Sequence, residues 1–79
     1  MTPKAKALLR ALVTRHIQRL RSGESAIDLL PADLARDYDL GLTPERLHEV
    51  ADEVVSEGLA TWTSEGALRL SPKALEKTL

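Results

Sequence analysis

The 79-residue chain contains no cysteine. It can therefore form neither a disulfide framework nor a thiolate metal site. Phenylalanine is also absent, and one tryptophan and one tyrosine are the only aromatic residues, too few for a platform on which single-stranded bases stack. No long apolar run is present near the N-terminus, because Lys6 and Arg10 interrupt it, which argues against a signal peptide or membrane span there. We therefore expect a cytoplasmic protein with no membrane partner.

Leucine and alanine supply most of the apolar residues. Fifteen leucines stand against four valines and two isoleucines. Leucine and alanine favour helices, whereas strands are richer in β-branched and aromatic residues. A chain of 79 residues suits one domain near the lower size limit for folding without disulfides or metal. We predict a single, mainly helical domain with a small β-hairpin over residues 1–79, with no cofactor.

Proline and glycine mark where the helices begin and end. All four prolines stand where a helix could start, and Thr2, Thr43 and Ser71 each precede one of them as a possible cap. Pro31 instead follows Leu30, which is a poor cap. The glycines end the periodic segments or form turns. We predict helices over residues 3–22, 31–38, 44–57 and 72–78, an extended segment over 25–29, and a hairpin of strands 59–63 and 67–70.

Helical periodicity selects the residues expected in the core. His16 falls in the middle of the apolar face of the first helix, so we expect a core histidine hydrogen-bonded to backbone. Trp62 alternates with threonines on the hairpin, where it would cap the edge of the core or, alternatively, act as an exposed interface anchor. The predicted core comprises Leu9, Leu12, Val13, Leu20, Leu34, Ala35, Leu47, Val50, Val54 and Leu70.

The order helix, short strand, helix, helix, hairpin, helix resembles the winged helix-turn-helix family. Four segments carry the resemblance: Asp33-Leu34-Ala35, Thr43-Pro44-Glu45-Arg46-Leu47, Glu57-Gly58-Leu59-Ala60 and Leu68-Arg69-Leu70-Ser71-Pro72. In that family the third helix enters the DNA major groove and the hairpin, or wing, contacts the backbone or minor groove. The resemblance implies a three-helix core plus wing, with base-reading positions near Pro44, Glu45, Arg46, His48 and Glu49.

The charges are divided unevenly along the chain. Residues 1–23 hold six basic residues and no acid, whereas residues 24–79 hold five basic residues and all twelve acids. This asymmetry indicates an interaction surface of defined sign; the alternatives are solvated faces or two segments that neutralise each other. If the protein binds duplex DNA, we expect contacts from Lys4, Lys6, Arg10, Arg15, Arg19, Arg46, Arg69 and Lys73.

The third helix departs from the usual chemistry of a DNA-reading helix. Its face opposite the apolar stripe is acidic, and the hairpin tip carries Glu65 rather than Lys or Arg. Acids that face a polyanion oppose the phosphate attraction that supplies most of the affinity. The same acids would suit a protein partner with a basic patch, which we expect to contact Glu45, Glu49, Asp52 and Glu53.

Two functions remain open at this stage, and neither is enzymatic. Neither histidine has an obvious serine nucleophile and orienting acid, no glycine-rich phosphate loop is present, and we expect no metal site. The family resemblance makes a DNA-associated regulator or accessory factor the first hypothesis, and the distribution of basic residues indicates that the first helix and the wing would contact the DNA. The acidic third helix favours a protein-interaction module. We also expect a possible homodimer, in which the basic first helix of one copy meets the acidic third helix of another.

Overall fold

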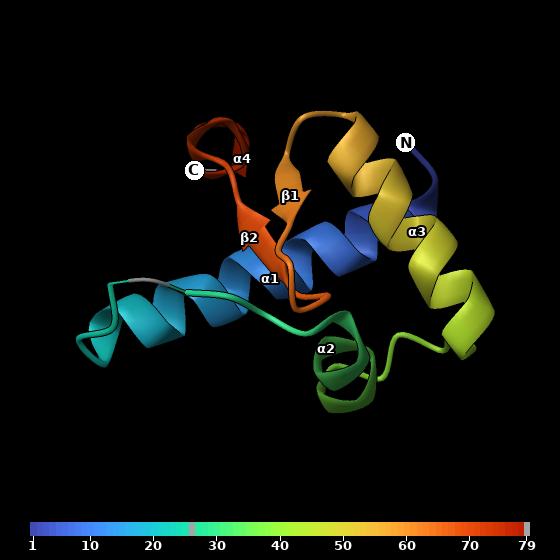
Figure 1. Ribbon diagram of the computed structural model, residues 1–79, viewed down its shortest axis with the longest axis horizontal. Helices are drawn as coiled ribbons and strands as arrows, with labels where there is room; N and C mark the ends of the chain where they lie inside the picture. The colour runs from blue at the N-terminus through green and yellow to red at the C-terminus, as the bar shows by residue number, and fades with distance from the viewer. Residues whose placement is uncertain (26, 79) are drawn as a thin grey trace.

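The computed structural model describes residues 1–25 and 27–78, which form a mainly helical domain with one β-hairpin (Figure 1). Every predicted helix and both strands of the predicted hairpin are present, and each of their observed boundaries lies within one residue of the expected one. The elements are α1 (Pro3–Arg21), α2 (Pro31–Asp37), α3 (Pro44–Ser56), β1 (Ala60–Trp62), β2 (Leu68–Leu70) and α4 (Pro72–Thr78). None of the described helices is long and apolar enough to cross a membrane.

The helix starts follow from the threonine caps. The Thr2 hydroxyl oxygen accepts a hydrogen bond from the Ala5 N–H at 3.3 Å, and the Thr43 hydroxyl accepts one from the Arg46 N–H at 3.3 Å. Each cap satisfies one of the N–H groups that have no partner inside the helix. Leu30, which precedes α2, makes no side-chain cap, as its residue type predicts.

The sheet consists of the two hairpin strands, and one residue of the segment that precedes α2 pairs with its edge. β1 and β2 pair antiparallel, with Thr61 opposite Arg69, and Gly66 adopts the left-handed φ of 80° in the turn. On the other edge of β2, Leu29 and Leu68 exchange two backbone hydrogen bonds of 2.9 and 2.7 Å. The extended segment predicted over residues 25–29 is thus a single bridge at Leu29, and Ala26 lies outside the described residues.

The core lies where α1 meets the other elements. α1 packs against α2, α3, α4 and β2. No charged or polar residue in the described part of the chain is buried. The largest fully buried side chains come from α1, α2, α3 and β2. These side chains are Leu8, Leu12, Leu34, Val54 and Leu68.

Three expectations about the core are wrong. Leu20 is 48% exposed, because the last turns of α1 project beyond the elements that cover its first half (Figure 1). Ala35 is half-buried, since it lines an open hollow between α2 and α3. His16 is also half-buried, and its Nδ1 atom has no hydrogen-bond partner in the described part of the chain, so the predicted bond to backbone is not made through that atom.

Candidate functional site

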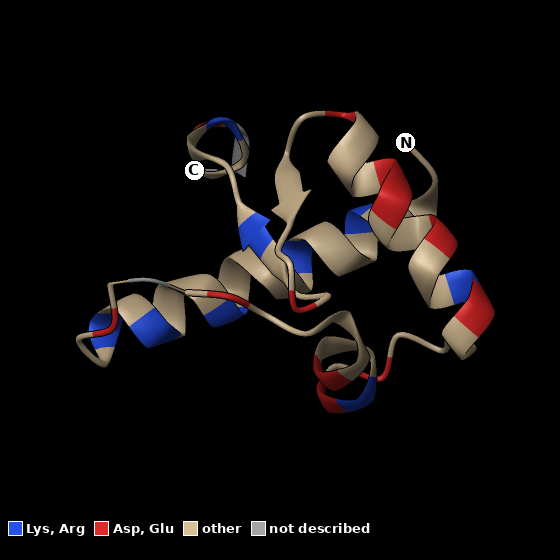
Figure 2. Cartoon of the chain, viewed as in Figure 1, with Lys and Arg blue, Asp and Glu red and all other residues tan. Residues whose placement is uncertain are grey.

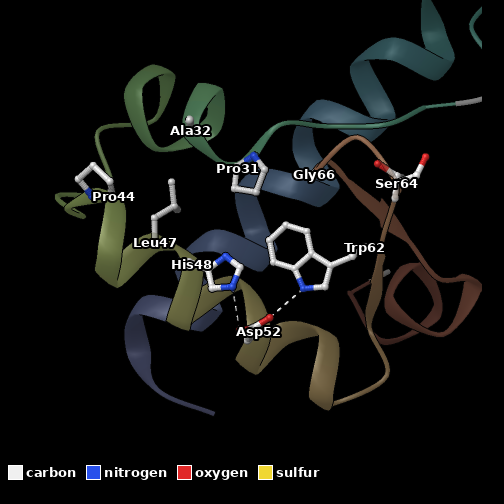
Figure 3. A pocket seen from close by; sticks show the side chains of 10 residues that line it. Pro31, Ala32, Pro44, Leu47, His48, Asp52, Trp62, Ser64 and Gly66 are labelled. Carbon is white, nitrogen blue, oxygen red and sulfur yellow. Dashed lines mark hydrogen bonds and ion pairs between the residues drawn. The ribbon is translucent and has the colours of Figure 1, made fainter.

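An open groove with a volume of about 680 Å³ lies between α3, the start of α2 and the hairpin (Figure 3). Its floor and walls are largely apolar, with Pro31 at the start of α2, Leu47 on α3 and Trp62 on β1. These residues meet because α2 and α3 pack together while β1 packs against α3. The groove is therefore a product of tertiary structure. Of its lining residues, Asp52 had been predicted to contact a protein partner, Pro44 and His48 had been predicted to lie near DNA bases, and Trp62 was an alternative interface anchor.

A cluster of three side chains forms one wall of the groove. The Trp62 Nε1–H donates to the Asp52 carboxylate at 2.8 Å, and the His48 Nε2 lies 3.3 Å from the other oxygen of that carboxylate. The His48 and Trp62 rings stack, with centroids 5.3 Å apart. His48 and Asp52 share a face of α3 because they are four residues apart. Asp52 thereby fixes the orientation of both rings, and Trp62 is a half-buried residue that borders the groove.

A second hollow of about 470 Å³ continues the groove along the contact between α2 and α3. Ala32, Pro44 and Leu47 line both hollows. Leu42 extends the apolar surface into the loop before α3. Ala32 is exposed to solvent. The two hollows therefore form one continuous strip with Ala32 at its middle.

The one charged residue that lines the larger hollow is an acid, and two further acids stand next to lining residues in the chain. None of its ten lining residues is Lys or Arg, and Asp52 is its charged residue. Glu65 lies between two lining residues at the hairpin tip, and Glu45 directly follows the lining residue Pro44. We call Glu45, Asp52 and Glu65 the acidic rim. An apolar surface with this rim is suited to a ligand that combines apolar and positively charged groups.

The acids predicted to bind a partner have different surroundings. Figure 2 shows the acidic residues along the outer side of α3. Glu45 makes no hydrogen bond or ion pair with the described residues, whereas Glu49 pairs with Arg46 at 3.2 Å. Glu53 accepts hydrogen bonds from the backbone N–H and hydroxyl of Thr2, at 2.6 Å and 3.1 Å. Glu53 thus fastens α3 to the start of α1, which reduces its availability to a partner.

Five of the eight residues predicted to contact DNA have partners within the fold. The Lys4 ammonium donates to the Leu40 carbonyl at 2.9 Å. The other four are in ion pairs: Arg15 with Asp37, Arg19 with Glu24, Arg46 with Glu49 and Arg69 with Asp28. Among the described residues, no partner is found for Lys6, Arg10 and Lys73. Six of the eleven Lys and Arg residues lie along α1, and the others are spread over α2, α3, β2 and α4 (Figure 2).

Two of these ion pairs also shift pKa values: the Asp28 carboxylate raises the pKa of Arg69, and the pair of Arg15 with Asp37 shifts the pKa of both partners. The Tyr38 side chain, and then the Asp37 carboxylate, raise the pKa of Arg15, whose guanidinium lies 5.5 Å from the centre of the Tyr38 ring. Hydrogen bonds from Arg15, and then from Arg36, lower the pKa of Asp37. The Arg15 contacts therefore hold α1 to the end of α2 with both groups in their charged forms.

Comparison with known proteins gives no match. No family model, no curated protein and no solved structure matches the chain. Within residues 1–25 and 27–78, no group of three or more His, Asp and Glu side chains is arranged to hold a metal ion. The groove and the distribution of charge are therefore the features that bear on function.

Proposed function

We propose that this chain is a winged-helix protein-interaction module that binds a basic, partly apolar segment of a partner protein in the groove between α3 and the hairpin. The observation that carries the proposal is the groove itself, which is apolar inside and bordered by acids, with no Lys or Arg lining its larger hollow. A tryptophan beside a hollow is a common anchor of protein interfaces. The acidic rim would attract a basic segment and orient it during association.

The same charges disfavour the usual DNA-binding mode of a winged helix. In that mode the outer face of α3 would enter the major groove. Glu45 and Glu49 are exposed on this helix, and Glu65 is exposed at the hairpin tip. These carboxylates would lie close to phosphates and weaken the electrostatic attraction on which DNA binding depends.

A pull-down experiment with the native chain and two arginine variants tests the proposal. Ala32→Arg places a long, positively charged side chain in the middle of the groove. The matched control Thr61→Arg adds the same side chain at an exposed position of β1 that does not line the groove. The immobilised proteins are mixed with a lysate of cells that produce this protein. We expect the native chain and Thr61→Arg to capture at least one protein that Ala32→Arg does not capture. The purified partner should then bind Ala32→Arg at least about tenfold more weakly in calorimetry, a loss of about 1.4 kcal/mol.

Identical capture by all three forms would show that the groove is not the binding site. The captured partner should also carry a basic segment, and its affinity should fall as salt rises, because exposed charges are screened. An affinity that is independent of salt would remove the role assigned to the acidic rim.

A second candidate function is DNA binding, which the family resemblance implies, here through the basic residues of α1 rather than through α3. The observation that favours it is that Lys6 and Arg10 have no partners among the described residues and are exposed on α1. Phosphate contacts from these residues would be independent of base sequence. Titration of a short mixed-sequence duplex at low salt, followed by fluorescence anisotropy, tests this candidate. Binding should be lost in the Lys6→Glu, Arg10→Glu double variant and strengthened in Glu49→Lys; no binding to the native chain would exclude it.

A further inference from the structure

The projecting end of α1 carries an exposed leucine beside a free positive charge. Leu20 is 48% exposed, one of three large hydrophobic residues exposed in the described part of the chain. Ile17 is half-buried and Arg21 is exposed, and no hydrogen bond or ion pair of the Arg21 side chain is found within the described residues. Spacings of three and four residues place Ile17, Leu20 and Arg21 on one side of the helix. We call these three residues the α1 tip.

The α1 tip and the groove are complementary in chemical character. The tip lies at the projecting end of α1 (Figure 1) and combines apolar and basic side chains, and the groove is an apolar hollow with an acidic rim. Residues 1–23 of the chain include every residue of the tip and contain no acid, whereas the rim belongs to residues 24–79, which carry all twelve acids. A single exposed leucine is common on protein surfaces, but here a matching site exists on the same molecule.

We infer that the partner of the groove is a second copy of this chain, which inserts its α1 tip. Leu20 of one copy enters the apolar floor near Leu47 and Trp62 of the other, and Arg21 meets the carboxylate of Asp52. This inference rests on the proposed function, because it names the occupant of the same groove. We infer a head-to-tail contact between these two different surfaces, in which each copy of a pair keeps one unused tip or groove. Association therefore continues beyond a pair.

The contact is expected to be weak. One helix end against an open groove buries less than the roughly 1,000 Å² of a stable protein interface. Charge attraction between Arg21 and the acidic rim adds to the apolar contact and is screened by salt. The native chain should therefore be monomeric when dilute and should gain mass steadily over about 10 μM to 1 mM, with a smaller gain at high salt.

Two complementary variants test the contact. Leu20→Glu removes the tip and keeps the groove, while Ala32→Arg blocks the groove and keeps the tip. Both positions are exposed, so both variants should fold, which circular dichroism and thermal melting can check. The matched controls are Thr61→Glu and Thr61→Arg, which add the same two side chains at an exposed position of β1 that belongs neither to the tip nor to the groove.

Light scattering or sedimentation should show that each variant alone stays monomeric, whereas the controls associate like the native chain. An equimolar mixture of Leu20→Glu and Ala32→Arg should reach the mass of a dimer and no more, because one intact tip and one intact groove remain. A mixture that stays monomeric under conditions where the native chain associates would overturn the inference. A native chain that is monomeric at every concentration tested would also overturn it. The proposed function would still stand if a different protein bound the native chain but not Ala32→Arg.

Discussion

The two halves of α1 have similar amphipathic sequences and different surroundings. In the first half Leu8, Leu12 and Val13 are buried against the other elements, whereas in the second half Ile17 is half-buried and Leu20 is exposed. Between the halves, Arg15 pairs with the end of α2. Helical periodicity thus identifies which side of a helix is apolar, but the length of the neighbouring elements decides how much of that side is covered.

Simple dimensions account for the difference. α1 has 19 residues, which at 1.5 Å per residue extend over about 28 Å. The longest dimension of the whole domain is 32 Å. α2 and α4 have seven residues each and α3 has thirteen. The other helices are therefore too short to cover α1 to its end, and the uncovered end is available for binding.

The largest effect is expected in the covered half. Leu12 is fully buried, so Leu12→Ala deletes buried methylene groups and leaves a cavity, at a cost of about 2–5 kcal/mol in the free energy of unfolding. Urea denaturation followed by circular dichroism measures this cost. A loss below about 0.5 kcal/mol, typical of surface positions, would contradict the division of α1 into a covered and an uncovered half.

Ile17→Ala should give an intermediate result. Ile17 packs against the core but is only partly covered, and the same denaturation experiment should give a loss of about 1–2 kcal/mol. A loss as large as that of Leu12→Ala would mean that the coverage of α1 extends further in solution than the structure shows.

The ion pair at the boundary between the halves predicts a pH-dependent effect. The pKa of Asp37 lies below its ordinary value of 3.8, so the pair stabilises the fold above that pH and the contribution is lost as pH falls through the lowered pKa. At neutral pH, Asp37→Asn should therefore lower Tm, by less than Leu12→Ala or Ile17→Ala does. In acid, the Tm of Asp37→Asn and that of the native chain should become equal. Asp39→Asn, an exposed neighbour without an ion pair among the described residues, is the control; equal effects of the two variants would exclude the ion pair as the cause.

The smallest effect is expected at the uncovered end. Leu20→Ala should change the free energy of unfolding by less than about 0.5 kcal/mol, because this side chain is already largely in contact with water. Measurement at a protein concentration low enough to keep the chain monomeric separates stability from association. A loss near 2 kcal/mol would restore Leu20 to the core, where the sequence had suggested it lies.

The helices were predictable because local signals define them. Thr2 and Thr43 cap their helices as expected, and the observed ends differ from the predictions by at most one residue. The groove was not predictable, because its walls come from α2, α3 and the hairpin, and their packing depends on contacts distant in sequence. Trp62 and Asp52 illustrate this point: each was noted separately, but their hydrogen bond requires β1 to pack against α3.

The bridge between Leu29 and Leu68 has a consequence for the order of folding. Strands of three residues are not stable as an isolated hairpin, and here the central strand is held by two hydrogen bonds to a residue 39 positions earlier. Closing that long loop costs less entropy once α2 and α3, which lie within it, are compact. The hairpin should therefore form after the helices, and the amides of Leu29 and Leu68 should exchange with solvent at the same rate. Because β1 carries Trp62, the groove is completed only in this last step.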